Sequence, residues 1–186
     1  MRLHQPFRCP RLLALGPRQP SASPAIPMHH FMNSFAILPS VTEELMTGRF
    51  HGAAGYDVRC ALDGDFIKGR VGGKLAGKSF NLEITETGVQ GTAAGLNVEV
   101  HLQDGALVGS IGDQELTLRG VDRVTGRLGG PIVGWDVAAQ QTGHKLVGRL
   151  GGTVIGKDFE FNLGEAPGWI GVLVALVSFY VFEQVA

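Results

Sequence analysis

A five-residue segment that returns along the chain constrains the fold more than any other feature. It reads Gly-Arg, then an apolar residue, and in its best copies it ends in two glycines. Its clear copies occupy residues 69–73, 126–130 and 148–152, a looser copy occupies residues 48–52, and degenerate ones begin at Gly91 and Gly109. The copies recur at a spacing of about twenty residues, and self-similarity of this kind predicts one repeated structural unit.

Each unit contains a second marker, a glycine followed by two residues that suit a tight turn. These glycines are Gly55, Gly77, Gly95, Gly112, Gly134 and Gly156. After the marker, apolar and polar residues alternate, as in residues 98–102 (VEVHL), and period-two alternation is typical of strands with one buried face. Further turn signals such as Asp104-Gly105 separate the units. Each unit is therefore predicted to be a β-hairpin.

Six hairpins in succession predict an all-β fold of about twelve antiparallel strands. Glycine, with 28 of the 186 residues, has no collagen period and is interleaved with Val, Leu, Ile and Phe, so it belongs to strands and turns rather than to a disordered linker. A meander of short strands has two open edges unless it closes into a barrel. The alternative is a β-solenoid acting as a structural or interaction protein, which the unequal unit lengths disfavour.

The C-terminal segment is apolar on every side. Residues 169–182 contain no charge, and Pro167-Gly168 precedes them as a breaker. A helix that is apolar all round must be buried in protein or in lipid. Spanning a bilayer takes roughly 17–25 residues, and no Lys or Arg flanks this run. The sequence therefore predicts a helix over residues 168–186 that fills the barrel, with a tilted tail anchor as the alternative.

At this point the chain resembles the tubby-like fold, which tubby proteins, phospholipid scramblases and the LURP-one-related group share. The likeness is architectural and covers about residues 47–186. It rests on the predicted barrel and on residues 172–177 (VLVALV) with Glu183 just after them, which is similar to the terminal helix of LURP-one-related proteins. No acidic calcium-loop pattern precedes the helix, and no functional residue of the family carries over to this chain.

The first 41 residues differ from the rest. They contain several prolines and four arginines, and no acidic residue occurs before Glu43. We interpret residues 1–41 as a disordered tail, or as a mis-assigned start with initiation at Met28 or Met32. A transit-type peptide is the other reading, because such peptides are rich in arginine and poor in acid. The barrel domain is assigned to residues 42–186.

The candidate binding residues are the arginines of the repeated segment. They are Arg49, Arg70, Arg127 and Arg149. Each precedes an apolar residue, so strand alternation points the arginines outward at one level of the barrel. Guanidinium forks suit phosphate, which makes these residues candidate contacts for anionic lipid headgroups. The alternative is a solvated outer face with ion pairs to neighbouring strands. Tyr56 and Trp135 are expected at hairpin tips. There they either enter a membrane interface as exposed aromatics or, in the reading we prefer, are packed or merely exposed.

Several chemistries are not expected. The histidines show no metal-ligand spacing, and the glycine strings are followed by strands rather than by the helix of a phosphate loop. Ser79 and Ser110 have no His–acid arrangement nearby, so no catalytic residue, cofactor or metal is assigned. A net charge of −1 disfavours nucleic acid. Two cysteines, Cys9 and Cys60, make a disulfide framework unlikely and suggest a reducing, cytoplasmic location.

The function expected from these patterns is a non-enzymatic binding or membrane-surface tethering module. Its partner would be an anionic membrane surface or another protein. The alternative is a ligand-carrying barrel whose helix leaves the lumen, for example as a tail anchor. Because fold alone does not determine function, the position of the C-terminal helix is the observation that separates these hypotheses.

Overall fold

The computed structural model describes residues 44–52, 54–73, 75–152 and 155–184. The predicted tail, residues 1–41, lies outside this part of the chain. Within the described residues the chain forms twelve strands, one α-helix and a π-helical turn. The elements are β1 (Glu44–Phe50), β2 (Tyr56–Asp63), β3 (Phe66–Val71), β4 (Lys78–Thr85), β5 (Gly88–Ala93), β6 (Leu96–Gln103), β7 (Ala106–Ile111), β8 (Gln114–Arg119), β9 (Arg123–Gly129), β10 (Gly134–Thr142), β11 (Lys145–Gly151), β12 (Gly156–Asn162), α2 (Gly168–Phe179) and the π-helical turn Tyr180–Gln184.

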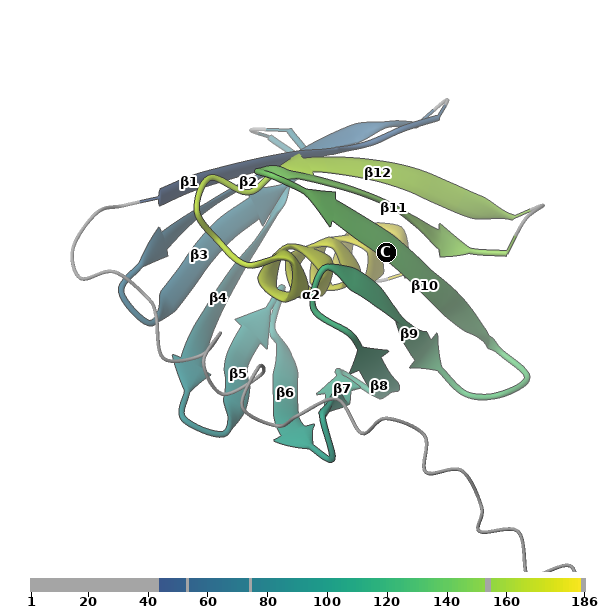
Figure 1. Cartoon of the computed structure of the whole chain (residues 1–186). Coiled ribbons are helices and arrows are strands. Elements are labelled where there is room, and N and C mark those ends of the chain that lie inside the picture. The colour runs from purple at the N-terminus through teal and green to yellow at the C-terminus, as the bar shows by residue number, and fades with distance from the viewer. Residues whose placement is uncertain (1–43, 53, 74, 153–154, 185–186) are drawn as a thin grey trace, which may run out of the picture.

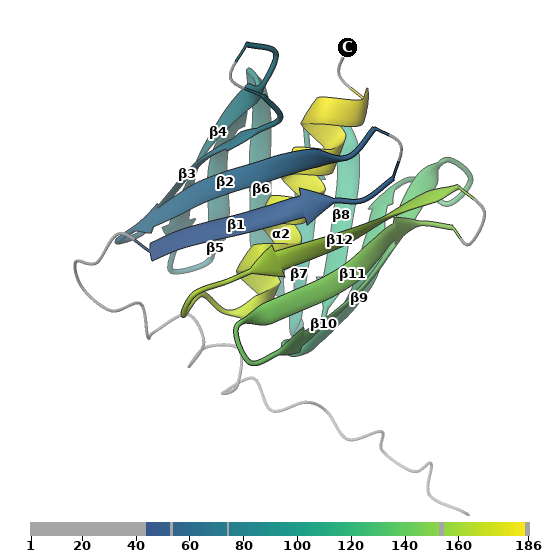
Figure 2. The ribbon, with the colours of Figure 1, turned by 90° about the horizontal axis from the view of Figure 1, so that it is seen from above.

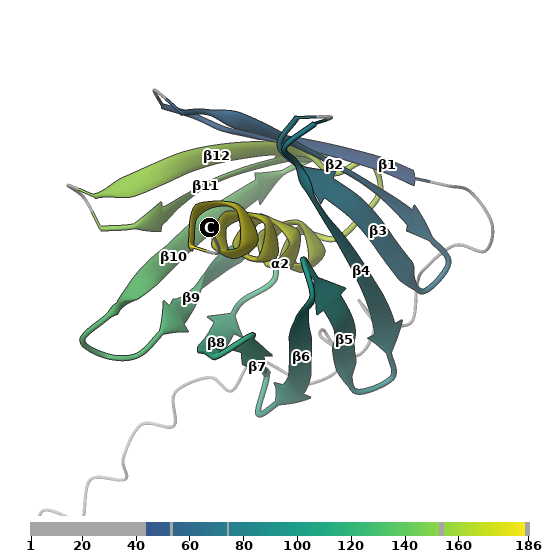
Figure 3. The same cartoon turned by 180° about the vertical axis from the view of Figure 1, so that it is seen from behind.

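The strands form one closed antiparallel barrel. Every strand pairs with its neighbours along the chain, and β1 closes the ring against β12 with Thr47 opposite Asn162. Figures 1 and 3 look into the two ends and show the helix inside the ring of strands. The predicted twelve-stranded barrel is confirmed, and the solenoid alternative is wrong because the first and last strands pair directly.

Helix α2 runs through the barrel (Figure 2), and all twelve of its residues are buried. The α-helix ends at Phe179, earlier than the predicted 186, and the π-helical turn follows where the chain leaves the apolar lumen. No helix among the described residues is long and apolar enough to cross a bilayer. The apolar segment is therefore buried in protein, as its length predicted.

Three inward-facing glycines make room for phenylalanine rings. Gly69 on β3 lies directly opposite Phe80 on β4, and a Cβ at Gly69 would overlap that ring. The pairs Gly48–Phe161 and Gly148–Phe159 repeat the same relationship across other strands. In three copies of the Gly-Arg segment the glycine is thus a packing requirement, because a side chain there would displace a large core ring. In the fourth copy, a Cβ at Gly126 would collide with the carbonyl oxygen of Thr117.

The barrel has two distinct ends. We call the end where α2 finishes the mouth and the opposite end the base. The loops at the mouth are residues 51–55, 72–77, 94–95, 112–113, 130–133 and 152–155. The loops at the base are residues 64–65, 86–87, 104–105, 120–122 and 143–144, together with residues 163–167, which lead into α2.

The second glycine marker differs from its prediction in four units. Tight turns at the marker occur only at residues 94–95 and 112–113 among the described loops. Elsewhere the marker glycine closes a longer loop and the next strand begins there. Gly77 shows the reason, because a Cβ would collide with the carbonyl oxygens of Gly73 and Val71. The marker glycine permits a close backbone approach instead of a positive φ.

Candidate functional site

The four long loops of the mouth belong to neighbouring hairpins. Strand pairing places β9–β10 beside β11–β12, which lies beside β1–β2, which lies beside β3–β4. The short turns of β5–β6 and β7–β8 occupy the remainder of the ring. One side of the mouth therefore carries all the long loops that the structure describes, in full or in part.

Three of these loops expose large aliphatic side chains at their tips. Leu75 in the β3–β4 loop is fully exposed, Ile155 in the β11–β12 loop is 85% exposed, and Ile132 and Val133 in the β9–β10 loop are 93% and 72% exposed. A single exposed apolar side chain is normal on a protein surface. Four on three hairpins on one side of the mouth indicate an interaction surface. The β9–β10 and β11–β12 hairpins are neighbours, and β1–β2 lies between them and β3–β4. We call Leu75, Ile132, Val133 and Ile155 the tip residues.

The predicted arginines each bind their own hairpin. Arg49, Arg127 and Arg149 form ion pairs at 2.5–2.7 Å with the aspartates directly across the hairpin. These partners are Asp57, Asp136 and Asp158. The arginines are thus distributed one to a hairpin, and Arg127 and Arg149 lie on β9 and β11 with β10 between them.

Three arginines also reach the loop above them. Arg127 donates hydrogen bonds to the carbonyl oxygens of Gly130 at 3.0 Å and Pro131 at 3.2 Å, next to the exposed tip. Arg149 binds Gly152 at 3.2 Å and Arg70 binds Gly73 at 3.4 Å in the same way. Exposed ion pairs contribute little to the stability of a fold, so the effect of these contacts is local. They fix the loops that present the tip residues.

The two aromatic residues expected at hairpin tips are packed against the core, which agrees with the preferred alternative and not with membrane insertion. Tyr56 is buried, and its ring stacks on Phe50 with centroids 4.7 Å apart. Trp135 is half-buried and meets Phe179 of α2 edge-on at 5.7 Å. In the hairpin of Trp135, the exposed Ile132 and Val133 occupy the tip in its place. The alternation of apolar residues places Tyr56 and Trp135 on the inner face, but sequence reasoning assigned both to turns.

The end of the helix is fastened to the mouth on two sides. Glu183 pairs with Lys157 at the start of β12, and the Tyr180 hydroxyl donates a hydrogen bond to Asp113 in the β7–β8 turn. Burial, with a smaller effect of Asp113, raises the pKa of Tyr180 to about 12. The hydrogen bond from Tyr180 lowers the pKa of the Asp113 carboxyl. The helix end is therefore held at the mouth by polar contacts with β12 and with the β7–β8 turn.

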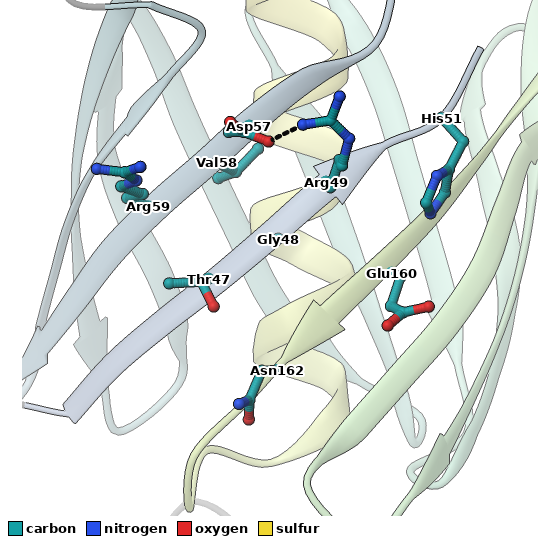
Figure 4. Close-up of a pocket in the computed structure, with 9 residues that line it drawn as sticks. All are labelled: Thr47, Gly48, Arg49, His51, Asp57, Val58, Arg59, Glu160 and Asn162. Atoms are coloured by element: carbon teal, nitrogen blue, oxygen red, sulfur yellow. Dashed lines mark hydrogen bonds and ion pairs between the residues drawn. The ribbon is translucent and has the colours of Figure 1, made fainter.

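A shallow groove of about 410 Å³ lies on the outer wall over β12, β1 and β2, and both polar and apolar residues line it (Figure 4). Two of its charged groups have partners, since Arg49 binds Asp57 and Glu160 binds Lys145 at 2.9 Å, whereas Arg59 makes no ion pair with a residue that the structure describes. No group of three metal-ligating side chains occurs in the described part of the chain. The groove has neither a nucleophile with a base nor a metal site.

The two ends of the barrel differ in charge. Five of the six base loops carry one carboxylate each, whereas the mouth loops contain a single carboxylate, Asp113, which Tyr180 already binds. The base carboxylates are Asp65, Glu86, Asp104, Asp122 and Glu165. An anionic surface is therefore repelled by the base more than by the mouth.

Comparison of the chain with protein-family models, with curated proteins and with solved structures found no match. The resemblance to the tubby-like fold stays a prediction about architecture. Function has to be argued from the mouth itself.

Proposed function

We propose that the protein is a non-enzymatic module that docks on anionic membrane surfaces with the mouth of its barrel. The observation that carries this proposal is the group of exposed tip residues on three hairpins on one side of the mouth. The absence of carboxylates from the long mouth loops supports the same orientation. The arginines act in this proposal mainly by holding the loops in place.

A bilayer fits the tip residues better than a rigid protein partner. Stable protein interfaces bury a continuous complementary surface of roughly 1,200 Å² or more. The tip residues stand on separate loops, and a fluid bilayer accepts separate insertions. Burial of each aliphatic side chain contributes about 1.5–3 kcal/mol, so four contribute ~6–12 kcal/mol before the costs of association. Micromolar binding corresponds to about 8 kcal/mol, which lies in this range.

The test is sedimentation with mixed phosphatidylcholine–phosphatidylserine vesicles. We expect the intact protein to bind, and the double variant Ile132→Asp, Ile155→Asp to bind at least tenfold more weakly. The matched control is Leu45→Asp, Phe66→Asp, which makes the same kind of change at exposed positions near the base. The control should bind as the intact protein does.

Two results would overturn the proposal. One is no association of the intact protein with these vesicles at low salt. The other is equal weakening by the tip variant and the base variant, which would mean that net charge alone governs binding. Loss of a specific protein partner in the tip variant, with no vesicle binding by the intact chain, would assign the surface to protein recognition.

A further inference from the structure

The β3–β4 hairpin departs from the pattern of the other arginine hairpins. Asp stands directly opposite Arg49, Arg127 and Arg149, but the residue opposite Arg70 is Ser79. Arg70 donates a hydrogen bond from Nη1 to the Ser79 hydroxyl at 3.3 Å. At this one hairpin of the four, the cross-strand residue supplies no negative charge.

The whole hairpin is basic. Residues 66–82 contain four lysines and arginines and no carboxylate. They are Lys68, Arg70, Lys74 and Lys78. The hairpin also carries the tip residue Leu75, so its charge lies next to an exposed aliphatic side chain.

A further arginine lies on the neighbouring strand. Arg59 on β2 is directly opposite Arg70 in the strand register, and strand alternation turns both to the outer face. Arg59 makes no hydrogen bond or ion pair with any residue that the structure describes. The nearest carboxylate along β2, Asp57, is held by Arg49 at 2.6 Å, and Figure 4 shows Arg59 turned away from that pair.

Two like charges directly opposite on one sheet face are destabilising, and an anion bound between them would offset that cost. We propose that Arg59 and Arg70 bind a phosphate monoester, with the Ser79 hydroxyl as a further polar contact. Paired guanidinium groups match phosphate oxygens. A monoester carries about −1.5 to −2 charges at neutral pH, whereas a phosphodiester carries one.

The phosphate has two sources, a lipid headgroup or a soluble phosphate monoester. The lipid source rests on the proposed membrane function, because Leu75 would enter the bilayer beside the bound headgroup. The soluble source does not depend on it. The probes are vesicles containing phosphatidic acid, vesicles of equal charge containing phosphatidylglycerol, and glycerol 3-phosphate in solution.

The first variant is Arg59→Gln, Arg70→Gln. Its matched control is Arg119→Gln, Arg123→Gln, which removes the same charge near the base. We expect the first variant to lose at least tenfold in affinity for phosphatidic acid vesicles, together with the preference of the intact protein for phosphatidic acid over phosphatidylglycerol. The control should keep both the affinity and the preference.

The second variant separates binding from folding. Ser79→Asp gives Arg70 the cross-strand partner that the other arginines have, so the melting temperature should stay level or rise while phosphate affinity falls at least fivefold. A loss of binding in this variant cannot come from unfolding. Unchanged phosphatidic acid binding in both variants would overturn the site.

The two proposals fail in different ways. If the tip variant loses vesicle binding while Arg59→Gln, Arg70→Gln does not, the phosphate site is wrong and membrane docking stands. If the intact protein ignores vesicles but glycerol 3-phosphate binds and Ser79→Asp abolishes that binding, the site stands and its ligand is soluble. Equal binding of phosphatidic acid and phosphatidylglycerol by the intact protein overturns the preference for a monoester.

Discussion

The Lys157 ammonium pairs with the Glu183 carboxylate and so joins the start of β12 to the turn that follows α2. Both side chains are about three-quarters buried, and Lys157 also lies over the Tyr56 ring at 4.9 Å from its centroid. The contact closes the mouth on the β12 side. It fixes the end of a helix whose other contacts are almost all apolar.

We expect Glu183→Gln to lower the free energy of unfolding by about 1–2 kcal/mol, because it leaves a partly buried ammonium without its partner. Denaturant unfolding measures the change. Glu165→Gln is the control, since Glu165 makes only an exposed contact with His144 at 3.7 Å and should cost little. Equal costs for the two variants would show that the Lys157–Glu183 pair does not fasten the helix.

The two tyrosines of the chain provide a second prediction. Burial first, and the Glu183 carboxylate second, raise the pKa of Tyr56 well above its usual value, and burial raises that of Tyr180 to about 12. The folded state therefore holds these protons more tightly than the unfolded state does. Their contribution to stability is complete below pH 10, the usual pKa, and falls as pH rises towards 12.

Absorbance at the tyrosinate band during alkaline titration tests this prediction. We expect no tyrosinate at pH 10 while the circular dichroism is native, and ionisation of both residues when the barrel unfolds. Ionisation of either tyrosine at its usual pKa in the folded protein would contradict the burial described at the mouth.

The pairing of Gly69 with Phe80 gives a third prediction. Gly69→Ala should destabilise the barrel by about 1–3 kcal/mol, the usual cost of overpacking a core. Combining it with Phe80→Leu should recover part of that loss, because the smaller side chain leaves room for the methyl group. Gly73→Ala, where a Cβ would meet nothing within contact distance, is the matched control. Additive costs in the double variant would rule out a direct clash.

The Arg127–Asp136 pair distinguishes loop positioning from lipid contact. If Arg127 bound lipid directly, Asp136→Asn would release its guanidinium and strengthen vesicle binding. We expect instead that Asp136→Asn leaves vesicle affinity level or slightly lower and changes stability by less than about 1 kcal/mol. Amide hydrogen exchange at Ile132 and Val133 should become faster. Stronger binding after Asp136→Asn would return Arg127 to the role of lipid contact.

The barrel and its internal helix could be predicted from the sequence because each follows from a pattern that extends over many residues. Repeated hairpin signals set the strand number, and an uncharged segment too short for a bilayer had to be buried. Strand alternation also predicted that Arg49 and the other arginines of the repeated segment point outward.

The partners of those arginines required the register. Whether Arg149 faces Asp158 or a neighbour two residues away depends on loop length, and the marker glycines Gly134 and Gly156 were assigned to turns when they begin strands. The tip residues were missed for the same reason, because an isolated isoleucine in a loop carries no periodic signal. The alignment of Arg59 with Arg70 likewise appears only once β2 and β3 are paired.

The most direct test of membrane docking is the depth in the bilayer of a fluorescent label attached at the mouth. Cys60 is buried and burial raises its pKa to about 12, so its thiol should not react. In a Cys9→Ser background, an environment-sensitive fluorophore on Ile132→Cys is compared with one on Leu45→Cys in vesicles that carry brominated lipid. We expect a blue shift and quenching for the label at position 132, with the label at position 45 remaining in water. Bound protein whose label at position 132 stays in water, or whose label at position 45 enters the bilayer, would contradict docking by the mouth.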